Sequence, residues 1–240
     1  MGEPVAELRQ VVKEHRDGST VVRALGGIDF AVHAGEMVAV TGRSGSGKST
    51  LLNVAGGLDE ATSGEVFVEG RPLTSLTAAE RAEHRRRHLG FVFQAANLVP
   101  ALTAEENVAL PLEFDGVRAS KAQASARQAL ERVGLVGLQR RFPDELSGGQ
   151  RQRVAIARAV VGTRRLILAD EPTGALDDLT GRSMFELLAG LANEGAAVVV
   201  VTHDDELAAY AGRIIRLKDG RVNQVVERSA APSGLGELLS

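Results

Sequence analysis

Three short runs of apolar residues stand out along the chain and predict strands that are buried on both faces. They are Met37–Val40, Leu166–Ala169 and Val198–Val201, and longer helical patterns lie between them. A strand without a polar face is typical of a parallel sheet that is covered by helices on both sides. The alternation of such strands with helices predicts an α/β fold.

Helix signals are concentrated in the middle of the chain. The stretch 103–106 begins with Thr and ends with Glu, the spacing of a capping box, and further helical patterns run over 120–134 and 149–161. Residues 95–160 hold most of the helical signal and no strong strand pattern. We therefore expect a helical subdomain over about 95–160, inserted into the α/β core.

Other segments carry strands that are interrupted by glycine. They lie in 21–40 and 64–73, and the Asp219-Gly220 pair within 214–226 is typical of a hairpin turn. We expect these segments to form an antiparallel β portion beside the parallel sheet. The overall prediction is a mixed sheet with an antiparallel β subdomain and a helical subdomain.

The composition narrows the class of protein. The 240 residues are 44% hydrophobic and 25% charged, and the absence of cysteine excludes disulfides and thiolate zinc sites. A net charge of −3 and an aromatic content of 3% argue against a nucleic-acid partner. The longest apolar run, Ala196–Val201, is too short to insert into a membrane. We expect a soluble intracellular protein, with one domain over 1–227 and a mobile tail over 228–240.

One basic run, Glu83–His88, interrupts this even distribution of charge. It lacks the aromatic residues and the wide basic face of a nucleic-acid site. We interpret it as the solvated face of a helix or as a contact for a protein partner.

A glycine-rich turn follows the first apolar strand and matches G-x-x-x-x-G-K-[ST] in full. Its residues are Gly42, Arg43, Ser44, Gly45, Ser46, Gly47, Lys48 and Ser49, and Thr50 continues into a helix. Glycines let successive backbone N–H groups approach phosphate oxygens, and the helix N-terminus adds a partial positive charge. Lys48 would contact the β- and γ-phosphates and the Ser49 hydroxyl would bind Mg²⁺. The sequence therefore predicts a P-loop NTPase core.

Polar residues also follow other apolar strands. Asp170 and Glu171 end the strand over 166–169, where Asp170 would contact Mg²⁺ and Glu171 would orient or deprotonate the attacking water. His203 follows the next strand and could donate to the γ-phosphate, because the carboxyl ends of parallel strands meet at one edge. Gln94 ends another apolar run and could contact Mg²⁺ or water, although a structural role is as well supported.

A second glycine-rich loop provides the decisive pattern. It consists of Leu146, Ser147, Gly148, Gly149 and Gln150, and Ser147 is expected to cap a helix whose N-terminus could meet an anion. With this loop the chain resembles the ABC-transporter ATPase family, in which LSGGQ is the signature motif. The order of motifs also matches: 42–49, Gln94, 146–150, Asp170-Glu171, 174–177 and His203.

The resemblance implies that two copies pair head to tail around two ATP molecules. Lys48 and Ser49 of one chain would hold a nucleotide that is closed by residues 146–150 of the other chain, with Asp177 in the loop that crosses the interface. ATP would be the substrate and Mg²⁺ the cofactor.

The resemblance also assigns the site residues. Ser49, Gln94 and Asp170 would hold Mg²⁺. Catalysis would depend on Glu171, His203, Gln94 and Lys48. Gln94 would in addition lie at the joint with the helical subdomain and report the γ-phosphate to an integral membrane permease.

A finer resemblance concerns the MacB/LolD-like subgroup of this family. Phe91-Val92-Phe93-Gln94 followed by Asn97-Leu98-Val99-Pro100 is similar to that subgroup, which serves lipoprotein release and macrolide export. It implies a subunit in the cytoplasm, bound through its permease to the inner face of the membrane. The alternative within the same resemblance is a mechanical role, in which the ATPase gates an extracytoplasmic enzyme without moving a substrate.

The chain departs from the family at His15. The family usually has an aromatic residue there, mostly Tyr, which stacks on adenine. Imidazole offers less stacking area, and base stacking is worth about 1–3 kcal/mol. We predict weak base selectivity and modest ATP affinity.

Overall fold

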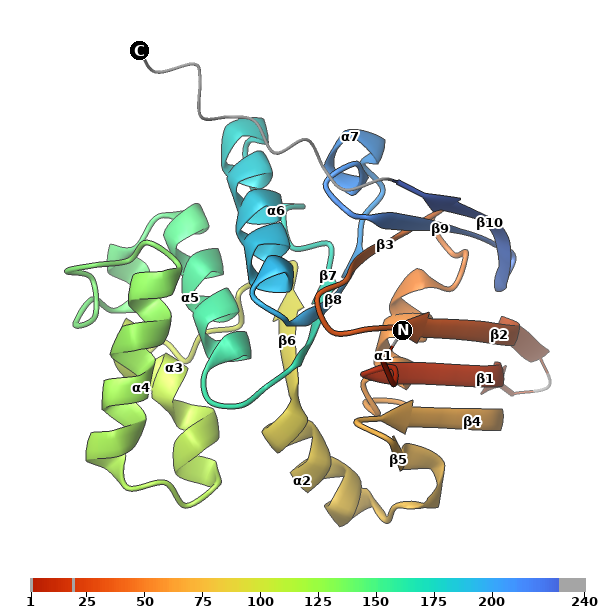
Figure 1. Cartoon of the computed structure of the whole chain (residues 1–240), viewed down its shortest axis with the longest axis horizontal. Helices are drawn as coiled ribbons and strands as arrows, with labels where there is room; N and C mark the ends of the chain where they lie inside the picture. The colour runs from red at the N-terminus through yellow and green to blue at the C-terminus, as the bar shows by residue number, and fades with distance from the viewer. Residues whose placement is uncertain (1, 19, 229–240) are drawn as a thin grey trace.

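The central element of the structure is a six-stranded sheet (Figure 1). The computed structural model describes residues 2–18 and 20–228, so the predicted tail over 228–240 lies outside the described residues except for Arg228. The strands of this sheet are β3 (Met37–Thr41), β6 (Leu89–Phe93), β7 (Leu166–Asp170), β8 (Ala197–Val201), β9 (Arg213–Lys218) and β10 (Arg221–Glu227). Their order is β10-β9-β3-β8-β7-β6, and all neighbours run parallel except β10, which is antiparallel to β9.

The three apolar runs form β3, β7 and β8, as predicted. Every residue of β3 and β8 is buried, because helices or a second sheet cover both faces. This burial explains why the strands read as continuous apolar runs and not as alternating patterns.

A second, antiparallel sheet lies beside the first. Its strands are β1 (Ala6–Asp17), β2 (Thr20–Val32), β4 (Ser63–Val68) and β5 (Arg71–Pro72), in the order β2-β1-β4-β5. The sequence prediction placed 214–226 in this portion as well, and for β9 and β10 that was wrong. The stretch 21–40 also included Met37–Val40, which forms β3 of the central sheet as its apolar run predicted. The β9–β10 hairpin joins the central sheet because β9 pairs in parallel with β3, with Val38 opposite Arg213.

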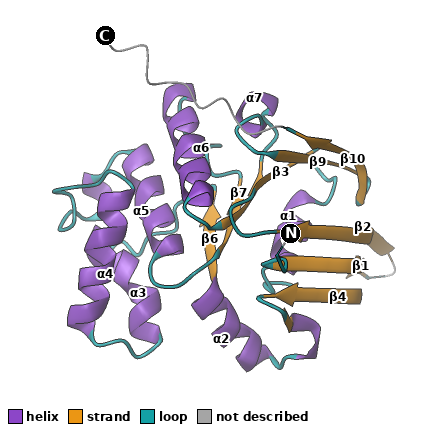
Figure 2. Cartoon of the chain, in the orientation of Figure 1, coloured by secondary structure: helices purple, strands orange, loops and turns teal. Residues whose placement is uncertain are grey.

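The helices form separate groups. They are α1 (Lys48–Ala55), α2 (Ala78–His88), α3 (Ala104–Phe114), α4 (Ala119–Arg132), α5 (Gly148–Val160), α6 (Asp178–Asn193) and α7 (Asp205–Ala208), with 3-10 turns η1 (Leu73–Ser75) and η2 (Pro143–Glu145). Figure 2 shows α3, α4 and α5 together on one side of the central sheet, away from β1, β2 and β4. These three helices lie within the predicted helical stretch, whereas the proposed domain boundaries stay a prediction.

The local helix signals were correct to within two residues, since the pattern expected over 120–134 forms α4 over Ala119–Arg132. Thr103 and Glu106 form the predicted capping box of α3. The α4 helix begins at Ala119, one residue before the expected start at Ser120, because the carbonyl of Arg118 already accepts from the amide of Ala122. The α5 helix covers 148–160 where 149–161 was expected, since Ser147 is its N-cap.

Two apolar cores cover the two faces of the central sheet. On one face Val38, Val40 and Val199 pack with α1 and the antiparallel sheet. On the other face Ala39 and Val200 pack with α5, α6 and the rest of the helical group. Because each face is covered, side chains of the central sheet can reach a ligand only at its edges and at the ends of its strands.

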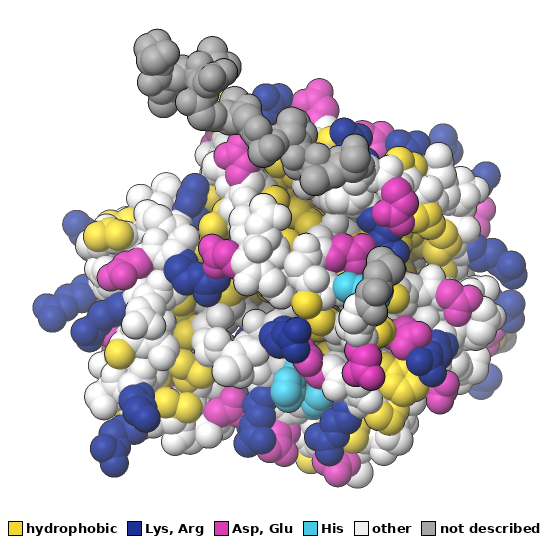
Figure 3. All heavy atoms as spheres, in the orientation of Figure 1, with side chains coloured by type: hydrophobic (Ala, Val, Ile, Leu, Met, Phe, Trp, Pro, Cys, Tyr) yellow, Lys and Arg dark blue, Asp and Glu magenta, His cyan; other side chains and the backbone are white. Residues whose placement is uncertain are grey.

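The basic run Glu83–His88 is only in part the solvated helix face that was predicted, since Glu83 and Arg87 are exposed, and its use as a partner contact stays a prediction. It forms the second half of α2, where His84 is buried and its Nε2 donates to the carbonyl of Val68 at 3.1 Å. Arg85 donates to the carbonyl of Gly57 at 2.7 Å. On the face drawn in Figure 3, Lys and Arg side chains are interspersed with Asp and Glu, so no single charge dominates there.

Candidate nucleotide-binding and hydrolysis site

The P-loop connects β3 to α1, as the motif predicted. Gly42, Gly45 and Gly47 have φ values of 149°, 77° and 99°, a region that side chains disfavour. A Cβ at Gly42 would lie 2.4 Å from the carbonyl oxygen of Leu217, and one at Gly47 would lie 2.4 Å from that of Ala24. The tight curve of the loop therefore requires glycine at both positions.

Lys48 is held against this loop. Its Nζ donates to the carbonyls of Gly42 at 2.8 Å and Arg43 at 3.1 Å, and the residue is 9% exposed. An ammonium group has three donors, so one remains for an anion. The loop residues 42–46 also line a cavity of about 820 Å³ together with His203, Arg216 and Lys218. Asp205 and Asp219 line the same cavity, and Asp205 is paired with Arg216 at 3.6 Å, so both signs of charge face the mouth of the predicted phosphate site.

Ser49 and Asp170 are 121 positions apart in the sequence but are hydrogen-bonded in the fold. The Ser49 hydroxyl donates to Asp170 Oδ1 at 3.1 Å, which joins the start of α1 to the end of β7. Burial raises the pKa of Asp170, the nearby Glu171 adds to the rise, and the Ser49 hydrogen bond opposes it. An oxygen-only pair of this kind suits Mg²⁺, which prefers one or two protein oxygens together with phosphate and water. The donor set therefore fits the predicted metal.

Glu171 and His203 form a pair that the sequence did not predict. His203 Nδ1 lies 2.9 Å from Glu171 Oε2, and the amide of Glu171 donates to Val201 at the end of β8. Glu171 has a φ of 47°, a strained value for a residue with a side chain. A carboxylate can only accept, so the histidine donates through Nδ1. In its neutral form the ring then has no donor left for a γ-phosphate, and that predicted contact remains a prediction.

Gln94 leaves the sheet beside this pair. The register of β6 and β7 places Phe93 opposite Asp170, so Gln94 and Glu171 follow neighbouring strand ends. A Cβ at Gly174 would lie 2.7 Å from Gln94 Nε2, which shows how closely the side chain packs on the loop after Glu171. Its role as a Mg²⁺ ligand stays a prediction.

His15 lies on β1 opposite Val22 of β2 and is exposed. Ala24, two residues farther along β2, contacts the P-loop at Gly47. His15 is thus on the strand pair that borders the P-loop, as its expected contact with the nucleotide base requires, and stacking on adenine stays a prediction.

The second glycine-rich loop begins α5. Ser147 and Gln150 form a capping box, and Ser147 and Gly148 are exposed. Leu146 is buried and anchors the loop in the helical core. Among the hydrogen bonds of the described residues, none links 146–150 to the P-loop residues 42–50. Figure 1 shows α5, which begins at this loop, apart from α1, which begins at the P-loop.

Asp177 and Thr180 support this loop, and Thr180 was missed by the sequence reasoning. Asp177 caps α6, where its Oδ1 accepts from the Thr180 amide at 2.9 Å and its Oδ2 from the Thr180 hydroxyl at 2.7 Å. A Cβ at Gly149 would lie 2.6 Å from the Thr180 methyl carbon. The Asp-x-x-Thr spacing at a helix start was the available signal. The predicted place of Asp177 at a dimer interface stays a prediction.

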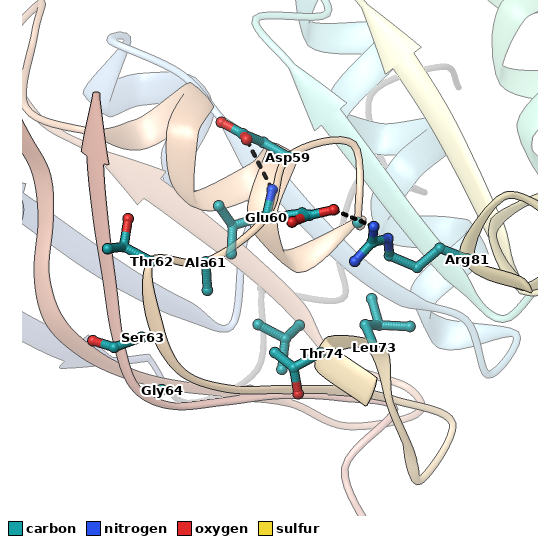
Figure 4. A pocket seen from close by; sticks show the side chains of 12 residues that line it. Asp59, Glu60, Ala61, Thr62, Ser63, Gly64, Leu73, Thr74 and Arg81 are labelled. Atoms are coloured by element: carbon teal, nitrogen blue, oxygen red, sulfur yellow. Dashed lines mark hydrogen bonds and ion pairs between the residues drawn. The ribbon is translucent and has the colours of Figure 1, made fainter. Parts of the chain in front are cut away.

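A different cavity, shown in Figure 4, provides no second phosphate site. It has about 240 Å³ and lies between the end of α1, β4 and η1. Asp59 and Glu60 line it, and Arg81 is paired with Glu60. An acidic lining at the C-terminal end of a helix disfavours an anion. This cavity is therefore not a candidate for a second phosphate.

Comparison with known proteins agrees with this geometry. Residues 25–174 match the ABC transporter family. The lipoprotein-releasing system ATP-binding protein LolD of Shewanella frigidimarina is 45% identical over 96% of this chain and 96% of its own length. The macrolide export ATP-binding/permease protein MacB of Shigella flexneri is 44% identical over 91% of this chain, which spans 34% of MacB.

A solved structure extends the comparison. The dimeric, post-hydrolysis structure of the ATP-binding cassette MJ0796 bound to ADP and Pi is 42% identical, covers 94% of this chain and all of its own, and has a TM-score of 0.85. The fold and the site thus define a P-loop ATPase with an α/β core and an inserted group of helices. The chain belongs to the ABC transporter family, as an ATP-binding cassette of the LolD and MacB type. In residues 2–18 and 20–228 no helix is long and apolar enough to cross a bilayer.

Proposed function

We propose that this chain hydrolyses ATP in composite sites between two copies of itself and that the cycle drives a membrane permease. The proposal of ATP hydrolysis rests on one observation. Beyond the carboxyl ends of β3 and β7, the structure brings together Lys48, Ser49, Asp170 and Glu171. Backbone N–H groups of 42–48 orient the phosphates, and Lys48 neutralises their charge. Mg²⁺, when bound by Ser49 and Asp170 and by Gln94 as a third ligand, supplies further charge neutralisation on the phosphates.

Glu171 is the proposed general base. Its carboxylate takes a proton from the attacking water, and His203 holds that carboxylate in place through Nδ1. His203 is therefore a positioning residue in this scheme. Replacement of Glu171 by Gln is expected to lower turnover by about 10²–10⁴ while leaving nucleotide binding intact. Full hydrolysis by this variant would exclude Glu171 as the base.

The proposal of composite sites is supported by the exposed start of α5. The amides of Gly148 and Gly149 lie in the first turn of a 13-residue helix, where backbone N–H groups have no intrahelical partner. Such donors can bind an anion presented by another chain. The dimeric cassette relative bound to ADP and Pi provides independent support.

The permease contact is proposed at a cavity of about 350 Å³ beside the Gln94 strand. The cavity lies between α2, β6, α3 and α5, and its lining includes Leu58, Arg85, Phe91, Phe93 and Arg158. Leu58 is exposed there, and the aromatic and arginine side chains around it are half-buried. Such a hollow suits a protein segment that carries both apolar and acidic residues. The relatives LolD and MacB are named for lipoprotein release and macrolide export. We propose that this chain likewise drives export or lipoprotein handling. The chain itself would be bound through its permease to the cytoplasmic face of the membrane.

The proposed permease contact can be tested by purifying this chain from native membranes and identifying the membrane protein that accompanies it. Leu58 is 46% exposed at the cavity, whereas Val136 is 72% exposed on a different loop. Leu58→Glu should reduce co-purification of an integral membrane protein, and the matched Val136→Glu should not. Equal capture by both variants would place the permease contact elsewhere, and capture of no membrane protein by the unaltered chain would contradict the transport proposal.

A further inference from the structure

The β9–β10 turn is inserted between β2 and the P-loop. The amide of Gly220, in this turn, donates to the carbonyl of Ser46 in the P-loop at 3.1 Å. The carbonyl of Gly220 accepts from the amide of Gly26 in β2 at 2.8 Å. Gly220 is buried, although it lies in a hairpin turn, and Figure 1 shows this hairpin above β2. The turn therefore links the nucleotide loop to the antiparallel sheet.

The contacts are between backbone atoms and leave no room for side chains. A Cβ at Gly220 would lie 2.6 Å from the carbonyl oxygen of Ala24. A Cβ at Gly42 would lie 2.4 Å from the carbonyl oxygen of Leu217 in β9. One at Gly47 would lie 2.4 Å from the carbonyl oxygen of Ala24. The turn and the P-loop are therefore in direct backbone contact, and the position of the turn limits where the segment that carries the phosphate-binding amides can lie.

The hydrogen bond to Ser46 has a direct consequence for those amides. In a trans peptide the C=O and the following N–H point in opposite directions, and the described residues contain no cis peptide bond. Because the Ser46 carbonyl is directed toward Gly220, the Gly47 N–H of the same peptide plane is directed away from the turn. We propose that the Asp219-Gly220 turn is a positioning element of the nucleotide site, which fixes the direction of the Gly47 N–H donor. This inference rests on the proposed role of the P-loop in phosphate binding.

The chain contains a matched control for this turn. The β4–β5 turn has Glu69 and Gly70 with φ values of 50° and 69°, and Asp219 and Gly220 have 49° and 71°. Gly70 is exposed, and a Cβ there would meet nothing within 4 Å. Alanine therefore suffers the same backbone strain at both positions, and only at 220 does it also collide with β2.

Calorimetric binding of MgATP and MgADP to Gly220→Ala and Gly70→Ala tests the proposal. We expect Gly220→Ala to weaken both affinities by about tenfold, the effect of one misdirected donor to a charged oxygen, and Gly70→Ala to change them by less than about twofold. A purely structural role would lower the melting temperature of both variants and leave the affinities equal. Equal affinities in the two variants would therefore overturn the proposal.

Hydrogen exchange in the unaltered chain gives a test that needs no variant. MgADP should slow exchange of the Gly220 amide, because a fixed P-loop holds its Ser46 acceptor in place, and should leave the Gly70 amide unaffected. An unchanged Gly220 amide in a chain that binds MgADP would contradict the positioning role. Failure of the unaltered chain to bind either nucleotide would instead contradict the proposed function itself.

Discussion

The hydrogen bond between Glu171 and His203 allows a test of what each residue does. His203 can act on the carboxylate that it contacts at 2.9 Å, or independently on the phosphate. The informative set is Glu171→Gln, His203→Ala and the double variant. Glutamine keeps the size of the side chain and an oxygen that accepts from Nδ1, but it cannot take a proton from water.

The expected magnitudes follow from the contact. Loss of the general base should cost about 10²–10⁴ in turnover. A hydrogen bond to a charged group is worth about 1.5–3 kcal/mol, so His203→Ala should cost about 10- to 150-fold in the presence of Glu171. If His203 acts through Glu171, its removal from the Gln variant should cost less than about threefold, because residues that work as a unit are not additive.

The assay is phosphate release at saturating MgATP, with nucleotide affinity measured separately for all four proteins. We expect strong coupling between the two substitutions and nearly unchanged affinities. The same loss on removing His203 in both backgrounds would show that His203 acts on the phosphate directly, and would refute the positioning role.

Three further predictions concern other parts of the chain. Lys48→Ala should weaken MgATP binding by about 10³ in calorimetry, since a charge pair at 4 Å is worth about 4 kcal/mol at an effective dielectric of 20; an unchanged affinity would mean that Lys48 does not contact phosphate. Gly149→Ala should abolish nucleotide-dependent dimers in sedimentation while each chain still binds MgATP, because the new methyl group meets Thr180 at 2.6 Å; intact dimers would argue against this loop as the closing element. Burial and the neighbouring His88 lower the pKa of His84, so stability is full above the unfolded value of about 6.5 and is lost as pH falls below it. The melting temperature should therefore drop more between pH 7.5 and 5.5 than it does in His84→Gln, and equal drops would contradict this.

The sequence predicted those strands in which every residue of the apolar run has the same, buried surroundings. Strands β3, β7 and β8 are buried on both faces, so their apolar runs were recognisable. Strand β1 was not recognised, because register shifts between Leu8 and Val11, and again near Lys13, break the alternation of polar and apolar residues. The β9–β10 turn was predicted, but its sheet was not, since pairing with β3 depends on contacts far apart in the sequence.

The same distinction applies to the site. The P-loop is a local motif, and its glycines and Lys48 are where the spacing placed them. The Glu171–His203 hydrogen bond joins residues 32 positions apart and depends on the order of the strands. The inward contacts of His84 and Arg85 were missed because their acceptors are backbone carbonyls, which the sequence does not reveal.

Mixing two inactive variants tests the composite site most directly. Lys48→Ala loses its own phosphate contact but keeps the loop 146–150, whereas Ser147→Arg keeps the P-loop and blocks that loop. Half of the dimers formed at random are mixed, and each mixed dimer has one complete site of two. We therefore expect the mixture to recover up to about a quarter of the unaltered ATPase activity. A mixture as inactive as its components, with mixed dimers shown to form, would contradict it.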